Sequence, residues 1–218
     1  MLRHDGPAML EHWTHGLATT LLLVTGIVLG LLFVPRLIEG PEAIGFVMNL
    51  HFVGVVFFLF GTFYWASNTV ISAYRLKEHL PSKNAIEYTK RHYGLLLGMK
   101  KFTMPPEEKY FESERMAFIL AVASTVVIII TGFLKVSAHV WDLSGSLMKT
   151  VTMTHDVATV AMLAFFLAHV FFAAVLPMSW PVLRSMFTGY LSLDNAEEEH
   201  RGWLAAIKGE EASDERAA

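Results

Sequence analysis

Four long stretches of this sequence carry almost no charge, and they constrain the fold more than any other feature. No Asp, Glu, Lys or Arg occurs at residues 13–35, 46–74 or 116–134, and Asp156 is the single one between 150 and 183. A helix needs roughly 20 apolar residues to cross the ~30 Å hydrocarbon core of a bilayer. We therefore predict four transmembrane helices, at about residues 10–34, 45–75, 112–135 and 148–177. The expected fold class is all-α, an integral membrane four-helix up-down bundle.

The composition agrees with a membrane protein and excludes several classes of site. The chain is 54% apolar and 17% charged, against about 25% charged in soluble domains. A net charge of −3 gives no reason to expect nucleic acid as a partner. With no cysteine there is no disulfide, no Cys-ligated iron–sulfur cluster and no covalent haem through C-x-x-C-H. Any redox centre must therefore be held by other side chains, and ten histidines are available.

Charge distribution predicts the domain limits and the topology. We expect residues 1–203 to form one membrane domain and the polar residues 204–218 to form a disordered tail. Of the 17 Lys and Arg residues, 14 lie in the terminal segments and the 75–115 region, and three (Arg36, Lys135 and Lys149) lie toward the other side of the membrane. Because basic residues favour the cytoplasmic side, both termini are predicted to be cytoplasmic.

Four histidines fall at two depths of the predicted bundle. His12 lies at the cytoplasmic start of the first helix, and His51 lies near the outer start of the second. His155 and His169 are 14 residues apart on the fourth helix, a rise of ~21 Å and ~40° short of four full turns. They therefore share one face, His155 at the depth of His51 and His169 at the depth of His12. Two bis-His b haems stacked across a membrane require such pairs of imidazoles.

Other readings of these residues stay open. His15 lies three residues after His12, so helical spacing alone does not separate the two. Gly26 follows His12 by 14 residues, where a missing Cβ would let a porphyrin approach, although glycines also favour close helix packing. A membrane histidine can be a packing residue, and zinc would need more than two ligands at each depth. The remaining histidines are expected to be solvated surface residues: His4, His79, His92, His139 and His200.

Residues 8–203 resemble the gamma subunit (cytochrome b556) of respiratory formate dehydrogenases and related bacterial quinone-reactive cytochromes. The first helix has the His12-Trp13 opening with Gly26 at the family interval, which favours His12 over His15. His51, His155 and His169 match the family's other ligand positions. The tail preserves a further family spacing through Met186, Gly189, Ser192, Ala196, His200 and Trp203.

The resemblance implies an electron-transfer role in a larger complex. It implies two haem b groups, an iron–sulfur partner subunit, a catalytic subunit, and menaquinone or ubiquinone as the exchangeable substrate. It also implies a bacterial-type inner membrane as the location. The chain has no nucleophile with a base, no phosphate-binding loop and no molybdenum or nickel ligands. We therefore expect no substrate-oxidising active site in this chain itself.

One segment departs from the family pattern. The formate dehydrogenase pattern Lys-Tyr-Asn-x-x-Gln is replaced by K109-Y-F-E-S-E-R115, so Phe111 and Glu114 stand where two amides lie by the quinone pocket. Our hypothesis is that Glu114, with Glu112 as a second candidate, carries protons to the quinone beside His169. The alternative is an ordinary acid at a helix N-terminus, stabilised by the helix dipole.

Other functions share parts of this pattern. The partner could be a hydrogenase or a thiosulfate reductase instead of formate dehydrogenase. A stand-alone cytochrome b561-type quinone oxidoreductase would share the histidines without needing the matching tail. A haem-free four-helix transporter or scaffold would use the helices alone.

Overall fold

The protein is helical throughout the part of the chain that the structure describes. The computed structural model describes residues 1–71, 73–99, 101–103 and 105–217, with side chains except at 70, 73–75 and 210–217. Among these residues, β pairing is limited to two isolated bridges, Leu2–Tyr190 and Leu31–Val34. The predicted all-α class is confirmed.

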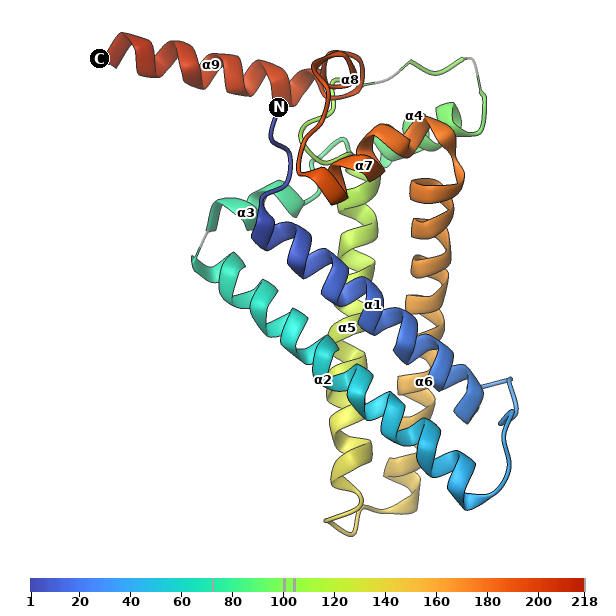
Figure 1. Ribbon diagram of the computed structural model, residues 1–218. Helices are drawn as coiled ribbons and strands as arrows, with labels where there is room; N and C mark the ends of the chain where they lie inside the picture. The colour runs from blue at the N-terminus through green and yellow to red at the C-terminus, as the bar shows by residue number, and fades with distance from the viewer. Residues whose placement is uncertain (72, 100, 104, 218) are drawn as a thin grey trace. The chain divides into compact units, whose positions relative to one another are not determined.

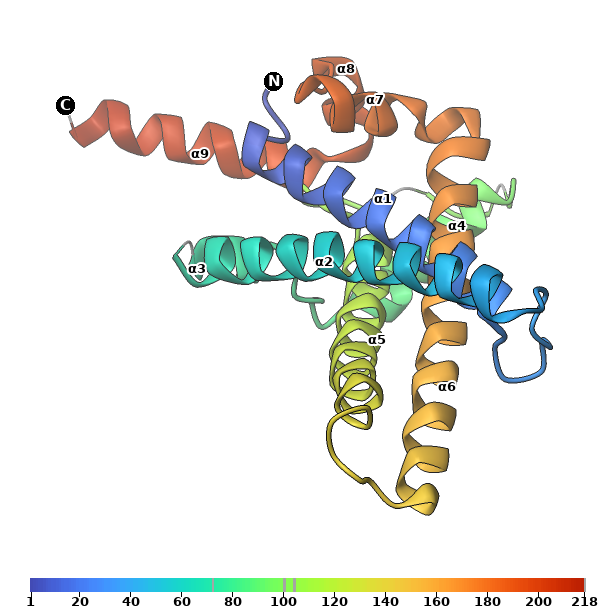
Figure 2. The same ribbon diagram turned by 60° about the horizontal axis from the view of Figure 1, so that its bottom comes forward.

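Four of the described helices are long and apolar enough to cross a membrane, as the sequence predicted. They are α1 (Gly6–Leu29), α2 (Pro41–Ile71), α5 (Glu112–Ser137) and α6 (Gly145–Val170), the last continued by the π-helical turn η1 (Phe171–Val175). Helices α1 and α2 run antiparallel side by side, and so do α5 and α6, in both Figure 1 and Figure 2. The spans therefore form two consecutive helical hairpins.

The first span ends five residues before its predicted end at 34. Gly30 has φ +99°, and a Cβ there would lie 3.2 Å from the backbone nitrogen of Arg36. Val34 precedes Pro35, and the residue before proline is disfavoured in a helix. Apolar side chains continue through residues 31–34, so hydropathy alone extended the helix into a turn.

The chain divides into two compact units. The apolar unit comprises Leu10–Val70 and Leu120–Ala168. The polar unit comprises Met1–Met9, Ile71–Ile119 and His169–Ala218. Its shorter helices are α3 (Ala73–His79), α4 (Ala85–Leu96), η2 (Pro177–Ser179), α7 (Trp180–Thr188), α8 (Leu193–Glu199) and α9 (Arg201–Ala217).

Helix α9 runs through residues for which the sequence predicted a disordered tail. The described backbone is helical as far as Ala217. Alanine, glutamate, lysine and arginine, which favour helices, are frequent here. The polar composition that suggested disorder therefore also suits a helix.

Candidate functional site

His51, on α2 of the apolar unit, is oriented by a threonine of α1. Its Nδ1 lies 2.7 Å from Oγ1 of Thr25, and that hydroxyl donates to the Leu21 carbonyl at 2.7 Å. A hydroxyl has one proton, so Thr25 Oγ1 accepts the Nδ1–H of His51. Nε2 of His51 has no hydrogen-bond partner among the described residues. Its lone pair is therefore available to a metal ion.

His155, on α6 of the same unit, repeats this arrangement in the second hairpin. Its Nδ1 lies 2.9 Å from Oγ1 of Thr131 on α5. The Thr131 hydroxyl donates to the Val127 carbonyl at 2.6 Å, so it too accepts an Nδ1–H. Nε2 of His155 is likewise without a hydrogen-bond partner in the described part of the chain.

A glycine directly follows each of these threonines. A Cβ on Gly26 would lie 3.9 Å from Cε1 of His51, and one on Gly132 would lie 3.4 Å from Cε1 of His155. His51 and His155 interact electrostatically with each other, and Lys135 interacts with both. The two rings therefore belong to one region of the apolar unit, with no side chain on the adjoining glycines. This region has the donor atoms that a bis-His haem requires.

His15 is bonded differently. Its Nε2 lies 3.2 Å from Oγ1 of Thr62, and its Nδ1 lies 3.3 Å from the Glu11 carbonyl. A Cβ on Gly61 would lie 3.2 Å from its ring, and Phe58 contacts the ring edge-on. Both nitrogens of His15 thus face acceptor oxygens, because the Thr62 hydroxyl donates to the Phe58 carbonyl at 2.8 Å. A neutral ring donates to only one of the two. His12 contacts Trp13 edge-on, with 5.4 Å between ring centroids.

The predicted inner pair is divided between the two units. His12 lies in the apolar unit and His169 in the polar unit, so their pairing stays a prediction. Within the polar unit, His169 interacts electrostatically with Glu114. The residue predicted to carry protons therefore lies within electrostatic range of a predicted ligand.

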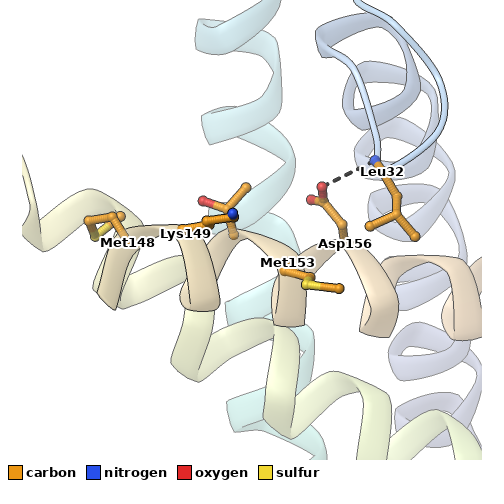
Figure 3. A pocket seen from close by; sticks show the side chains of 6 residues that line it. Leu32, Met148, Lys149, Met153 and Asp156 are labelled. Atoms are coloured by element: carbon orange, nitrogen blue, oxygen red, sulfur yellow. Dashed lines mark hydrogen bonds between the residues drawn. The ribbon is translucent and has the colours of Figure 1, made fainter. Parts of the chain in front are cut away.

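Asp156, the charged residue in the fourth apolar run, has a structural partner. Its Oδ2 accepts the Leu32 backbone N–H at 3.1 Å, as Figure 3 shows. Leu32 has φ +30°, an uncommon value for a residue with a side chain. Asp156 thus holds the turn after α1, beside a pocket that Met148, Lys149, Thr152 and Met153 also line.

The polar unit contains a buried acid before α5. Glu107 is only 2% exposed, and its Oε2 accepts the Glu112 backbone N–H at 3.0 Å. Its Oε1 has no hydrogen-bond partner among the described residues. Burial raises the pKa of Glu107 to about 7, and the nearby Glu112 and Glu114 carboxylates act in the same direction. Arg115, which pairs with Glu112 at 3.0 Å and with Glu108, opposes this rise.

Glu114 combines two contacts at the start of α5. Its Oε2 accepts the Phe111 backbone N–H at 3.0 Å and lies 3.4 Å from Nη2 of Arg3. The side chain remains 39% exposed. It can therefore stabilise the helix N-terminus and still exchange protons with solvent.

His200 is fully buried, which corrects the prediction that it is a solvated surface residue. Its Nδ1–H donates to the Glu108 carbonyl at 2.6 Å, while Nε2 has no partner in the described structure. Burial lowers its pKa to about 4. Phe111 stacks on His200 with 4.5 Å between ring centroids, and it contacts the His92 ring at a tilt of 45° and 4.3 Å. His4, also predicted to be solvated, is 5% exposed.

Three residues of the family spacing in the tail, Gly189, Ser192 and Ala196, have defined roles in the packing of this segment. Gly189 has φ +80°, and its carbonyl accepts the N–H groups of Arg3 and His4 at 2.8 and 3.1 Å. Ser192 caps α8 by accepting the Asn195 N–H, and Ala196 is fully buried. The segment is therefore folded onto the N-terminal residues of the polar unit.

The sequence did not point to two residues that hydrogen-bond to the site histidines. Thr25 and Thr131 were ordinary span residues until their contacts with His51 and His155 were known. The available signal was a Thr-Gly dipeptide in the first helix of each hairpin. The role of this dipeptide depends on which histidine it contacts, and that contact is set by the tertiary structure.

Four apolar spans, with two histidines whose Nε2 atoms are available for a metal ion, are the features expected of a membrane cytochrome of the b type. The chain belongs to the prokaryotic cytochrome b561 family, whose sequence model matches residues 3–189. A search of curated proteins gave no match. Family membership makes this protein a haem b-binding electron-transfer protein that crosses the inner membrane several times.

Proposed function

We propose that this chain is the membrane-anchoring di-haem cytochrome b subunit of a respiratory oxidoreductase of the formate dehydrogenase type. It links an iron–sulfur partner subunit, and through it a catalytic subunit, to the menaquinone or ubiquinone pool. The observation that carries the proposal is the repeated contact of Thr25 with His51 and of Thr131 with His155. A histidine that donates its Nδ1–H and keeps Nε2 free is typical of an axial metal ligand.

The chain's residues divide into two ligand sets. His51 and His155 would hold the outer haem, and His12 and His169 would hold the inner one. When bound, b haems supply reversible one-electron chemistry. The protein orients the His51 and His155 imidazoles through Thr25 and Thr131 and carries no side chain at Gly26, which adjoins the His51 ring.

Support for His12 over His15 comes from the ring nitrogens. Nε2 of His15 is within hydrogen-bond distance of Thr62, and its Nδ1 is within reach of a backbone carbonyl. Binding iron through either nitrogen would displace one of those partners. Together with the His12-Trp13 opening and its 14-residue interval to Gly26, this keeps His12 as our proposed ligand on α1.

Proton delivery to the quinone is assigned to Glu114, with both termini on the cytoplasmic side. Support comes from its partial exposure and its electrostatic interaction with His169. Glu114→Gln should lower quinone-reduction turnover while leaving the haem spectra intact. Glu87→Gln on α4, an exposed acid paired with Arg91, is the control and should retain full turnover. Unchanged turnover in Glu114→Gln would leave only its role at the helix N-terminus.

The partner can be tested by purification of the complex. Because α8 and α9 follow the membrane spans, they offer a surface that a stand-alone cytochrome would not need. A tagged chain taken from native membranes should carry an iron–sulfur protein with it. Recovery of the cytochrome alone, with full quinone reductase activity, would favour the stand-alone class.

Phe111 gives a second candidate within the same class. An aromatic ring between His92 and His200 replaces the amide of the formate dehydrogenase pattern. This departure from the formate dehydrogenase pattern keeps a hydrogenase or a thiosulfate reductase as the alternative catalytic partner. The genes next to this one would identify which subunit is supplied.

A further inference from the structure

The same contact is built twice from separate parts of the chain. In the α1–α2 hairpin, Thr25-Gly26 faces a histidine 26 residues after the threonine, His51. In the α5–α6 hairpin, Thr131-Gly132 faces a histidine 24 residues after the threonine, His155. The sequences around the two dipeptides otherwise differ, so the shared feature is the contact itself.

The hydroxyl groups are held in the accepting orientation. Thr25 Oγ1 lies 2.7 Å from the Leu21 carbonyl and 3.2 Å from the Leu22 carbonyl. Thr131 Oγ1 lies 2.6 Å from the Val127 carbonyl and 3.2 Å from the Ile128 carbonyl. With the hydroxyl proton directed at its own helix, a lone pair faces the imidazole.

Burial keeps water from competing for the two Thr–His hydrogen bonds. Thr25 is 4% exposed and Thr131 is 6% exposed, so solvent scarcely reaches either hydroxyl. A hydrogen bond in such an environment is stronger than one in water. Each contact can therefore fix both the tautomer and the rotation of its ring.

We propose that Thr25 and Thr131 are positioning residues that fix the Nδ1–H tautomer of two ligands of one haem and thereby lower its midpoint potential. The inference rests on the proposed function, in which His51 and His155 bind that haem. Hydrogen bonding at the second nitrogen makes a ligand imidazole more basic, and a more basic ligand stabilises oxidised iron. Loss of either hydroxyl should therefore raise the midpoint potential.

The test is a redox titration of the b-type α-band in the purified holoprotein. Thr25→Val and Thr131→Val remove the hydroxyls at nearly constant volume. Each should shift the same haem wave upward, the double variant should shift it further, and the other wave should stay unchanged. Thr20→Val is the matched control because Thr20 makes the same bond to a carbonyl four residues earlier, at 2.7 Å, but is exposed. Its titration should equal that of the wild type.

Serine variants separate the hydroxyl from the packing of the methyl group. Thr25→Ser and Thr131→Ser keep the acceptor, so both should keep the wild-type potential and haem content. Loss of haem from the valine variants alone would also support positioning. Haem loss from the serine variants, or unchanged potentials in both valine variants with both haems present, would overturn the inference. Shifts of two different waves would support positioning but contradict the proposed pairing of His51 with His155.

Discussion

The contacts of the His15 ring nitrogens add to what sequence spacing gives for the two histidines of α1. His12 and His15 are three residues apart on α1, and both fall near the predicted membrane surface. In the structure, Nε2 and Nδ1 of His15 lie 3.2 and 3.3 Å from Thr62 and the Glu11 carbonyl. These contacts tie His15 to both helices of the α1–α2 hairpin, and binding iron through Nε2 would displace Thr62.

Haem content should distinguish the two histidines. His12→Ala should lose one of two haems, because it removes a proposed axial ligand. His15→Ala should retain both haems, since it removes only contacts between helices. Pyridine haemochrome spectra of the purified variants give haem per polypeptide. A haem lost from His15→Ala but kept by His12→Ala would reverse the assignment.

Ionisation of Glu107 should lower the free energy of unfolding as the pH rises. A salt-bridged acid has the opposite effect. Its pKa rises from 4.5 in the unfolded chain to about 7 in the folded protein, chiefly through burial. The protonated form favours folding, so this contribution is fully present below pH 4.5 and is lost as the pH rises through 7. Such a pKa change corresponds to at most about 3 kcal/mol.

The substitution Glu107→Gln should reduce this pH dependence. We expect the variant to lose less stability than the wild type between pH 5 and 8, as measured by thermal unfolding in detergent. Glu197→Gln, at an exposed position of α8, should keep the wild-type profile. Parallel profiles for Glu107→Gln and the wild type would show that the Glu107 carboxyl does not titrate in this range.

At the scale of elements, the start of α9 packs with its backbone against the backbone of Pro106 and Glu107. Gly202 donates its N–H to the Glu107 carbonyl at 2.9 Å. A Cβ there would lie 2.7 Å from the Pro106 carbonyl oxygen, too close without backbone movement. Gly209 lies in the same helix, and a Cβ there would meet nothing within 4 Å.

Alanine substitutions at these two glycines should have opposite effects. Gly209→Ala should stabilise α9 by up to about 1 kcal/mol, the usual preference of a helix for alanine. Gly202→Ala should destabilise the polar unit despite that preference, because the Pro106 backbone must move. Protease resistance of the C-terminal segment and thermal unfolding measure both effects. Equal stabilisation by the two substitutions would mean that the segment does not dock as described.

The four spans could be predicted from sequence because hydropathy is a local property. The end of α1 could not be read from hydropathy, since apolar residues continue past Gly30 into the turn before Pro35. Burial of His200 depends on Phe111 and on the Glu108 carbonyl, 92 residues earlier, and no local pattern encodes such a contact. Thr25 and Thr131 escaped notice for the same reason.

For the whole molecule, two observations concern the proposed pairing of His51 with His155. One is the spacing of the histidines along α6, and the other is the Thr–His contact that both hairpins contain. The sequence predicted that His51 and His155 share a depth, and both lie in the apolar unit, where His51 acts electrostatically on His155. His12 and His169 were paired by the same depth argument, and that pair stays a prediction. The count of two haems therefore depends on a direct chemical measurement.

Haem content and redox titration of the purified wild-type chain and its histidine variants test the proposed di-haem arrangement most directly. We predict two haem b groups per polypeptide and two redox waves. His51→Ala and His155→Ala should each remove the same wave, and His12→Ala and His169→Ala should each remove the other. One haem per wild-type chain, or different waves lost from His51→Ala and His155→Ala, would contradict the arrangement.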